Sequence, residues 1–477
     1  MNPRLATALV FGTSFCILVI EILAGRLLAP IVGVSLETFT GIIGTVLAGI
    51  ALGNTIGGRL ADRHDPQLFI GPALVAGGIF TWLSVVLASI LNPTPGAGAV
   101  TIVGLSTVLF FAPAVVLSTV SPLVAKLMIQ SLDDSGKVVG NLSAAGTVGA
   151  LAGSFMAGFV LVATIGTRTL FIVIGAVLVL AGASLTGWER VRENAVLAAI
   201  VVALPVGGAL AVGDRCQAET SYACANLVVD AERPSGRSVV LNGFRNSYVD
   251  LDDPSYLEFR YARLMAGALD NIEPGPLRVV HVGGAGYTMA RYLAAERPGS
   301  DQIVLEIDGD LVDFIADELG PVEGPDTEIV VGDARLTLSE LETDSHDLII
   351  GDAFSGLTVP WHLTTTQFVE ELERVLTPDG TVMLNLVDGG EIAFAEASLA
   401  TYAEHFDHVA LIEPPGGTPA FGGFNFVLLA SDEPIPAPRI DAEDGLLIDA
   451  GRTARLVADG LVLDDDFAPV DQMRQTR

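Results

Sequence analysis

The hydrophobic pattern of the chain changes abruptly near Gly213. Before this point, seven mainly apolar stretches follow one another, each close to the roughly 20 residues that a helix needs to cross a bilayer. The pattern predicts membrane-spanning helices at residues 5–25, 38–58, 69–91, 99–120, 143–163, 168–187 and 194–212. Dense Gly and Ala, as in "GTVGALAGSFMAG", predict a compact bundle, because small residues let helix backbones approach closely.

Two features of the helical half raise a transport hypothesis. Glu21 lies well inside the first apolar stretch, and an acid within a membrane is a functional candidate by default. The alternative is that Glu21 reaches water or Arg26 at the interface. "GGRLADR", residues 57–63, resembles the short cytoplasmic motif of major-facilitator transporters, but it also suits a tight turn on the positively charged side.

After Cys216, short β-branched runs are followed by a regular alternation of strand and helix patterns. Strands are predicted at 277–282, 302–307, 328–331, 348–351 and 381–386, and helices at 287–295, 309–319 and 365–376. This alternation is typical of a doubly wound, parallel α/β sheet, whose ligands bind at the carboxyl ends of the strands. We therefore expect an α-helical membrane bundle followed by an α/β domain with a small β subdomain.

The first two strand ends carry residues suited to a nucleoside. Gly283, Gly284 and Gly286 follow the first strand in "HVGGAGYT", where a glycine turn lets the backbone approach a ligand. Glu306 ends the second strand, and a carboxylate at this spacing can accept hydrogen bonds from both ribose hydroxyls.

The next two strand ends add acidic residues. Asp333 and Ala334 follow the third strand in "VVGDA", where the carboxylate could accept from an adenine amino group. Asp352 ends the fourth strand in "LIIGDAFSG". Any one of these residues could simply cap a helix, but the ordered set predicts a nucleoside site.

Charge separates the two halves further. The chain carries a net charge of −31, yet residues 1–213 hold 9 basic and 8 acidic residues, so the acidity belongs to the second half. Nucleic-acid binding needs clustered Lys and Arg to neutralise phosphates, and the chain has only Lys126 and Lys137 as lysines. We therefore expect no nucleic-acid partner. Six scattered histidines and three cysteines without paired ligand spacing offer no metal site.

Together with "VVLNGFRNSYVDLDDPSYLEFRYARLM", these motifs resemble the spermidine synthase (polyamine synthase) family over residues 226–431. The whole chain is similar to bacterial and archaeal proteins that fuse such a domain to a multi-helix membrane region. The resemblance implies a methyltransferase-type sheet and a role in polyamine biosynthesis. It gives Asp352 the task of helping to deprotonate the attacking amine. It also places Tyr261, from the family's "EF-x-Y" segment, in the acceptor pocket.

The departures from the family pattern fall mostly on the amine side. Gly286 replaces the Asp of the glycine loop, Ala262 and Arg263 replace a His and a Glu, and Ser355 replaces the second Asp of the fourth-strand motif. Losing carboxylates removes partners for a dicationic diamine. A sulfonium nucleoside, S-adenosylmethionine or its decarboxylated form, is therefore a firmer expectation as donor than putrescine is as acceptor.

The sequence thus predicts a membrane-anchored transferase that moves an aminopropyl or methyl group to a small amine or other acceptor, without a metal. Membrane lipid would surround the helices, and a homodimer is left open. The expected division is 1–213 helical, 214–253 linker and small β subdomain, 254–440 α/β domain and 441–477 acidic C-terminal tail. The alternatives are a transporter with a regulatory nucleoside-binding domain and a catalytically inactive scaffold.

The side of the membrane on which the second half lies is predicted from charge. Arg4, Arg59, Arg63, Lys126, Lys137, Arg190 and Arg192 would collect on the cytoplasmic side, leaving Arg26, Arg168 and Arg215 outside. With seven spans the second half would face outward. Cys216 and Cys224 could form a short disulfide loop, which suits an oxidising compartment. The cytosolic synthesis of sulfonium nucleosides favours the opposite side.

Overall fold

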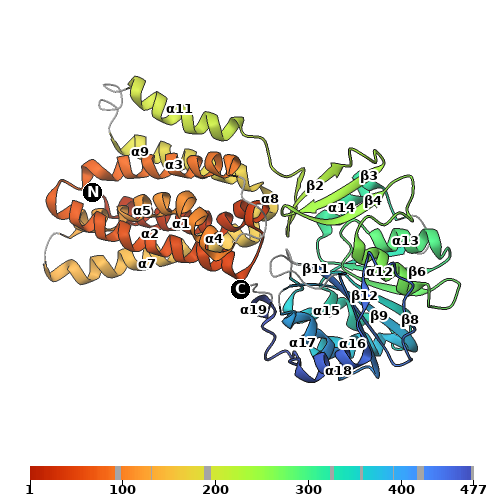
Figure 1. Cartoon of the computed structure of the whole chain (residues 1–477). Coiled ribbons are helices and arrows are strands. Elements are labelled where there is room, and N and C mark those ends of the chain that lie inside the picture. Colours follow the sequence, from red (N-terminus) through yellow and green to blue (C-terminus); the bar gives the residue numbers. More distant parts are fainter. Residues whose placement is uncertain are drawn as a thin grey trace. The chain divides into compact units, whose positions relative to one another are not determined.

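The computed structural model describes residues 1–91, 98–129, 132–186, 195–322, 327–354, 358–389, 391–415 and 424–473. The chain forms two compact units, Met1–Cys224 and Ala225–Arg477. The division therefore falls at Cys224 rather than near Gly213. Figure 1 shows helices alone in most of the first unit, and a sheet with helices on both faces in the second.

The first unit is a helical bundle. Its helices are α1 (Pro3–Val32), α2 (Leu36–Arg63), α3 (Gln67–Ile90), α4 (Ala99–Ser106), α5 (Ala112–Ser118), α6 (Val120–Met128), α7 (Leu132–Met156), α8 (Val162–Thr164), α9 (Thr167–Thr186) and α11 (Ala195–Ala211). Two π-helical turns, η1 (Thr107–Phe111) and η2 (Ala157–Leu161), continue α4 into α5 and α7 into α8.

Small residues bring the helices of the bundle together, as predicted. A Cβ atom added to Gly149 would lie 2.3 Å from the Phe11 carbonyl oxygen, and one added to Gly153 would lie 2.5 Å from that of Phe15. Such distances leave room for hydrogen only. The close packing of α7 on α1 therefore depends on glycine at these two positions.

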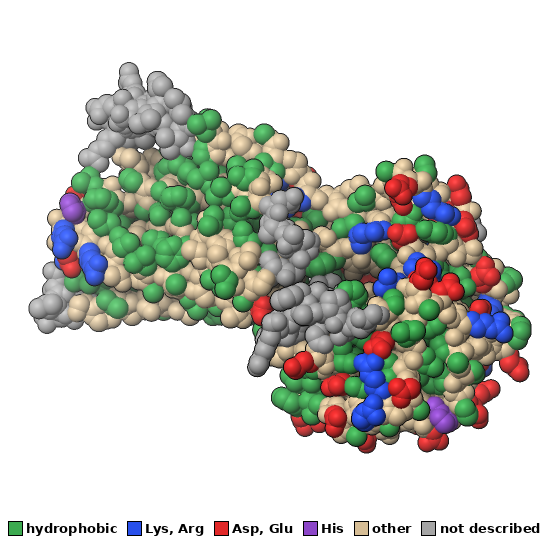
Figure 2. Space-filling view, in the orientation of Figure 1, with side chains coloured by type: hydrophobic (Ala, Val, Ile, Leu, Met, Phe, Trp, Pro, Cys, Tyr) green, Lys and Arg blue, Asp and Glu red, His purple; other side chains and the backbone are tan. Residues whose placement is uncertain are grey.

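Six helices, not the predicted seven, are long and apolar enough to cross a membrane within the described residues: Pro3–Val32, Leu36–Arg63, Gln67–Ile90, Ala99–Met128, Ser135–Thr164 and Thr167–Thr186. The seventh predicted stretch forms α11, which has 17 residues. At about 1.5 Å per residue, such a helix falls short of a hydrocarbon core of roughly 30 Å. Figure 2 shows hydrophobic side chains over much of the visible bundle surface, and acidic and basic ones scattered over the second unit.

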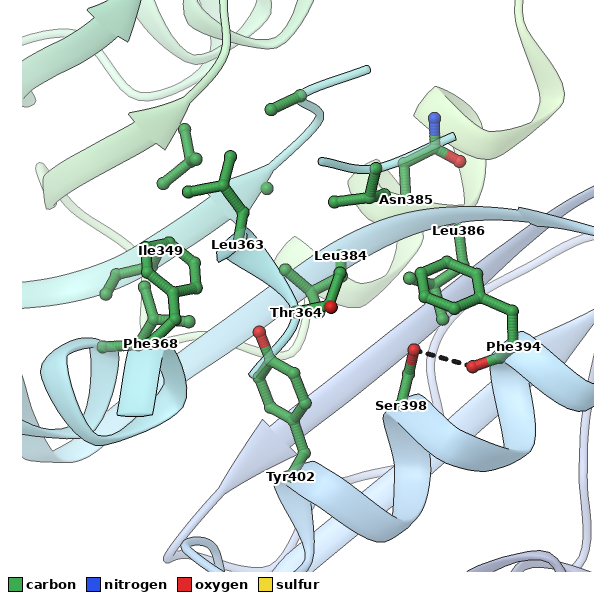
Figure 3. Close-up of a pocket in the computed structure, with 15 residues that line it drawn as sticks. Ile349, Leu363, Thr364, Phe368, Leu384, Asn385, Leu386, Phe394, Ser398 and Tyr402 are labelled. Atoms are coloured by element: carbon green, nitrogen blue, oxygen red, sulfur yellow. Dashed lines mark hydrogen bonds between the residues drawn. The ribbon is translucent and has the colours of Figure 1, made fainter. Parts of the chain in front are cut away.

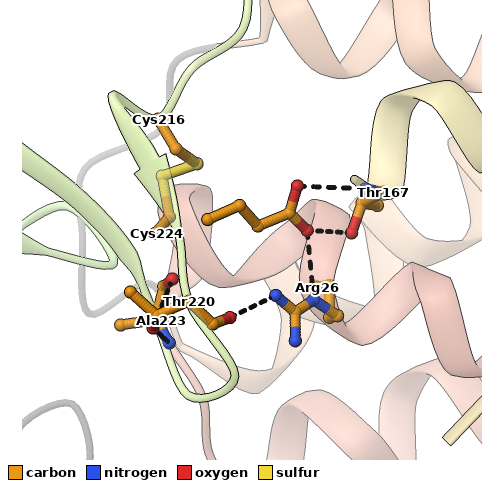
Figure 4. The surroundings of a disulfide bond; sticks show 7 residues. Arg26, Thr167, Cys216, Thr220, Ala223 and Cys224 are labelled. Carbon is orange, nitrogen blue, oxygen red and sulfur yellow. Dashed lines mark hydrogen bonds and ion pairs between the residues drawn. A yellow bond between two sulfur atoms is a disulfide. The ribbon is translucent and has the colours of Figure 1, made fainter. Parts of the chain in front are cut away.

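The end of the first unit is closed by a disulfide, as predicted. Cys216 and Cys224 are bonded, and the loop between them contains the short strand β1 (Ala218–Glu219). Glu219 accepts hydrogen bonds from the Arg26 side chain at 3.1 Å and from the Thr167 backbone at 3.0 Å. Figure 4 shows Arg26 and Thr167 near the Cys216–Cys224 disulfide. Arg26 therefore pairs with Glu219 rather than with Glu21.

The second unit begins with a small antiparallel sheet of β2 (Cys224–Val229), β3 (Gly236–Leu241) and β4 (Phe244–Asp250). An α/β domain follows. Its strands are β5 (Arg278–Val282), β6 (Asp301–Glu306), β7 (Thr327–Val331), β8 (His346–Gly351), β9 (Leu376–Asp388), β10 (His408–Glu413), β11 (Phe424–Ser431) and β12 (Leu446–Leu447). Its helices are α12 (Arg260–Leu269), α13 (Thr288–Glu296), α14 (Gly309–Leu319), α15 (Ala334–Thr337), α16 (Thr366–Val375), α17 (Ala393–Tyr402), α18 (Ala450–Asp459) and α19 (Val470–Met473), with 3-10 turns η3 (Leu338–Glu340) and η4 (Trp361–Leu363).

The large sheet has the order β12-β10-β11-β9-β8-β5-β6-β7. Strands β7, β6, β5, β8 and β9 run parallel, and β11, β10 and β12 continue the sheet antiparallel to their neighbours. The chain winds outward from β5 in one direction and from β8 in the other. The predicted doubly wound sheet is confirmed, and its switch point lies between β5 and β8.

Alternating side chains of the central strands build a core on each face of the sheet. Val279 and Ile350 pack with Met265 of α12 on one face, whereas Val280 and Ile349 pack with the side chains of α16 and α17 on the other. This period of two follows from the strand geometry. The two cores fix the carboxyl ends of β5 and β8 side by side.

The segment predicted as an acidic tail is packed against the domain. Helix α18 lies against α17, and Leu456, Leu463 and Val470 are buried. Residues 441–473 therefore complete the hydrophobic core beneath α17.

Candidate functional site

The glycine loop follows β5 and lies directly against the end of β8. Gly283 has φ +87°, and a Cβ atom there would lie 2.7 Å from the Asp352 carbonyl oxygen. Both the left-handed backbone and this close approach favour glycine. The loop thus brings the first and fourth predicted motifs into contact at the switch point of the sheet.

Glu306, at the end of β6, turns its carboxylate into this loop. One oxygen, Oε2, accepts from the backbone N–H groups of Gly284 at 2.9 Å and Ala285 at 3.3 Å, and Oε1 accepts from that of Asp308 at 3.1 Å. Burial is the largest influence and raises the pKa of Glu306, while these hydrogen bonds lower it. A carboxylate offers about four acceptor positions, so a ribose would have to share this side chain with the loop.

Asp352 is the centre of a partly buried hydrogen-bond network. Its Oδ2 accepts from the Tyr261 hydroxyl and its Oδ1 from the Asn385 amide, both at 2.8 Å. Asn425 in turn donates to the Asn385 amide oxygen at 2.8 Å. Burial raises the pKa of Asp352 to about 6, although both hydrogen bonds act in the opposite direction. A carboxyl group with this pKa can take up a proton near neutral pH.

The third motif forms the start of α15. Asp333 caps this helix, accepting from the Arg335 N–H at 2.9 Å, and its other oxygen lies 3.3 Å from His362 Nε2. Ala334 is buried beside it. Asp333 therefore already has two polar neighbours, and contact with an adenine remains a prediction.

Gly286 lies against the small sheet rather than at the mouth of the loop. A Cβ atom on it would come within 2.7 Å of the Ser247 hydroxyl oxygen and 2.9 Å of a Val239 methyl group. Ser247 is itself hydrogen-bonded to Thr288 of α13 at 2.6 Å. The family's Asp at this position would require the side chains of Ser247 and Val239 to shift.

The other departures from the family pattern also have structural consequences. Arg263 forms an ion pair with Asp444 at 2.6 Å, so it ties α12 to the C-terminal segment instead of facing an amine. Ala262 is fully buried. Ser355 lies outside the described residues.

Two cavities reach the carboxyl edge of the sheet, one on each face. The first is lined by Gly283, Gly284 and Asp352 together with Ser247, His281 and residues of α13. The second is lined by Gly351, Ala353 and Asn385 together with apolar residues of α16 and α17 (Figure 3). Tyr261, expected in the acceptor pocket, lines neither of these two cavities; its hydroxyl holds Asp352 instead.

Sequence reasoning missed Asn385, Asn425 and His362. The two asparagines lie in the apolar strands "VMLNLVD" and "FNFVLLA", where an amide costs free energy unless it is hydrogen-bonded. An isolated Asn in each buried strand was therefore a usable signal. His362 follows a Trp in the loop before α16 and had no comparable signal.

Comparison with known proteins finds polyamine aminopropyltransferases among the similar proteins. No family model matches the chain. The polyamine aminopropyltransferase of Vibrio vulnificus is 31% identical over 170 residues, which cover 34% of this chain and 55% of that protein. The polyamine aminopropyltransferase of Chromobacterium violaceum is also 31% identical, over 30% of this chain and 54% of its own length. This chain therefore spans about half the length of these two relatives.

A third relative extends the similarity to the helical unit. Polyamine aminopropyltransferase 2 of Streptomyces coelicolor is 27% identical over 92% of this chain and 86% of its own length. Among solved structures, a probable spermidine synthase from Corynebacterium glutamicum is 27% identical with a TM-score of 0.49, covering 54% of this chain and all but 1% of its own. The chain is therefore similar to polyamine aminopropyltransferases, and its described residues include six long apolar helices ahead of the α/β domain.

Proposed function

We propose that the protein is a membrane-anchored transferase that moves an aminopropyl or methyl group from a sulfonium nucleoside to a small nucleophile. The observation that carries this proposal is the position of Asp352. Its backbone lies at the switch point, against Gly283 of the glycine loop, and its carboxylate is held by Tyr261 and Asn385. The curated names of the relatives support the aminopropyl version.

The reaction needs little covalent participation by the protein. The nucleophile forms a bond to the carbon next to the sulfonium, the carbon–sulfur bond breaks, and its electron pair leaves on sulfur as a neutral thioether. Asp352 takes the proton that the attacking amine loses. Holding donor and acceptor in line supplies much of the rate, because it converts an encounter into an intramolecular step.

The donor would lie across the glycine loop and the ends of β6 and β7. Gly283 and Gly284 would let it approach the backbone, Glu306 would contact the ribose, and Asp333 with Ala334 would lie beside the adenine. S-adenosylmethionine and its decarboxylated form share the nucleoside that these residues would hold. The two donors differ only in the chain attached to sulfur, which carries a carboxylate in S-adenosylmethionine and none in the decarboxylated form. The residues on the acceptor side of the site would therefore decide between them.

Turnover by the full chain in detergent tests the proposal. Each donor is offered with a panel of amines, and the thioether product, methylthioadenosine or S-adenosylhomocysteine, is measured. Formation of either product, lost in Asp352→Asn, is expected. If neither donor is consumed while both still bind, the regulatory nucleoside-binding alternative replaces the transferase.

The second part of the proposal is that the α/β unit lies outside the cytoplasm. The loop preceding Ala225 is tied to the ends of α1 and α3 through Arg26 and Arg215, the latter donating to the Leu91 carbonyl at 2.9 Å. The opposite ends of α2 and α6 carry Arg63 and Lys126. Basic residues favour the cytoplasmic side, and the Cys216–Cys224 disulfide suits an oxidising compartment.

Side-chain contacts connect this loop to the bundle end opposite Arg63 and Lys126, so the assignment requires the chain to return across the bundle after α9, through the segment that contains α11. A reporter fused after Arg477 tests it directly. Alkaline phosphatase, which needs an oxidising compartment, should be active there, and a fluorescent protein that matures only in the cytoplasm should be dark. The reverse pattern would place the unit inside.

A further inference from the structure

The second cavity, between the sheet and helices α16 and α17, has an unusual lining. It comprises about 480 Å³ of empty space, including a part open to solvent. Its walls are mainly the side chains of Ile349, Leu363, Phe368, Leu384 and Phe394, and none of the described residues that line it is ionisable at neutral pH. A second ammonium group entering it would find no carboxylate partner, and burying an unpaired charge is costly.

The polar side chains that line this cavity are satisfied, with one exception. Ser398 donates to the Phe394 carbonyl at 2.8 Å, and Thr364 donates to that of Trp361 at 2.7 Å. Asn385 is engaged by Asp352 and Asn425. The Tyr402 hydroxyl is fully buried and has no hydrogen-bond partner among the described residues. In Figure 3 its ring rises from α17 with the hydroxyl directed among the lining side chains.

The cavity adjoins the reacting group. Gly351 and Ala353, which flank Asp352 in the chain, both line it. So does Asn385, whose amide nitrogen is 2.8 Å from Asp352 Oδ1. A nucleophile whose proton is taken by Asp352 could therefore extend its chain past Asn385 into this space.

We propose that this cavity holds the uncharged end of the acceptor, an aliphatic chain that carries one hydrogen-bonding group for the Tyr402 hydroxyl. This inference rests on the proposed transferase function and narrows its acceptor from any small nucleophile to a monoamine with a neutral polar end. The apolar walls would bind the chain by removing its surface from water. The buried hydroxyl would gain the partner that such groups nearly always have.

The matched probes are putrescine, aminobutanol and n-butylamine, which share a four-carbon chain and end in an ammonium, a hydroxyl and a methyl group. With the full chain in detergent, kcat/KM should be highest for aminobutanol and at least about tenfold lower for putrescine, since the ammonium lacks a partner. Tyr402→Phe should remove the advantage of aminobutanol over n-butylamine, roughly 2- to 10-fold for one hydrogen bond. Val359 lies at a partly exposed wall of the cavity. Val359→Phe should therefore lower kcat/KM for both aminobutanol and n-butylamine.

Tyr292→Phe is the control, because this tyrosine of α13 lines neither cavity. Aminobutanol binding is also measured by calorimetry, so that the cavity can be judged apart from turnover. Two results would overturn the inference while leaving the transferase proposal intact. One is turnover that prefers putrescine, and the other is an acceptor preference that neither Tyr402→Phe nor Val359→Phe changes. If no donor is consumed, the proposed function fails. In that case, the proposal that the cavity binds the acceptor would still be supported if aminobutanol binds and Val359→Phe abolishes this binding. It would be overturned if aminobutanol does not bind, or if Val359→Phe leaves its binding unaltered.

Discussion

The Tyr261 hydroxyl donates a 2.8 Å hydrogen bond to Asp352 Oδ2, joining α12 to the end of β8 across 91 positions of the sequence. The tyrosine is itself buried, and burial, followed by the neighbouring Asp352 charge, raises its pKa well above the usual value. It therefore remains a donor throughout the physiological range. The pair thus holds a carboxylate in a partly buried site, where desolvation makes its charge costly and increases its basicity.

Replacing the Asp352 carboxylate should change stability and activity in opposite directions. The pKa of Asp352 is raised to about 6 in the folded state, so the folded chain favours the protonated form. The stability contributed by this group is greatest below the unfolded pKa of about 4 and is lost as the pH rises through 6. At pH 7.5, Asp352→Asn should raise the free energy of unfolding by about 2 to 3 kcal/mol while lowering turnover at least ~100-fold.

Asp347→Asn is the contrasting variant, because Asp347 forms an ion pair with Arg278 at 2.6 Å. Burial raises the pKa of Asp347, but the hydrogen bonds from Arg278 outweigh burial, so that the pKa is lowered. That variant should lose stability at pH 7.5 and keep its activity. Urea unfolding and thioether release measure the two quantities. An Asp352→Asn protein that is less stable than the wild type would contradict the assignment of a costly buried charge.

The acid limb of the pH–rate profile should follow the pKa of Asp352, which its hydrogen-bond partners influence. With a pKa of about 6, kcat/KM should rise with pH through this value, since only the carboxylate can accept the proton. Tyr261→Phe removes a donor that favours the charged form, so the limb should move to higher pH. A hydrogen bond to a charged group contributes about 1.5 to 3 kcal/mol, equivalent to roughly 1 to 2 pH units.

Tyr248→Phe serves as the matched control for this profile. Tyr248 also donates to a carboxylate, that of Asp230, at 2.8 Å, but it belongs to the small sheet. Its removal should leave the acid limb in place. A limb that Tyr261→Phe does not move, despite wild-type folding, would mean that another group sets the pH dependence.

Glu306→Ala should weaken nucleoside binding and loosen the glycine loop at once. The side chain holds the N–H groups of Gly284 and Ala285, and it is the predicted ribose ligand. Loss of its charge-assisted hydrogen bonds, about 1.5 to 3 kcal/mol each, should raise the Kd for methylthioadenosine at least tenfold. Hydrogen exchange at the two amides should become faster. Faster exchange with unchanged Kd would assign Glu306 to the loop alone.

The sequence predicted the sheet well because its signals are local. Helix α14 has the predicted bounds, 309–319, and the central strands begin and end within two residues of the prediction, except β9, which is longer at both ends. Strand-end residues such as Gly283 and Asp352 could be placed at one edge because parallel topology dictates it. Their partners could not be named, since the Asn385 and Tyr261 contacts depend on side-chain packing between distant segments. Nor could the sequence show that Glu306 turns inward.

The last prediction concerns two positions where the family carries an Asp and this chain does not. Ser355→Asp should improve putrescine as an acceptor, about tenfold in kcat/KM, by giving an ammonium group a charge-assisted partner. Gly286→Asp makes the same change in charge, but its Cβ would meet Ser247 and Val239 at 2.7 and 2.9 Å. It should therefore destabilise the fold by about 1 to 3 kcal/mol without improving putrescine. Gly286→Ala, with the same contacts and no charge, should lose a similar amount of stability. A stable Gly286→Asp protein with better putrescine turnover would mean that the Ser247 and Val239 side chains make room and that the missing charge alone sets the acceptor preference.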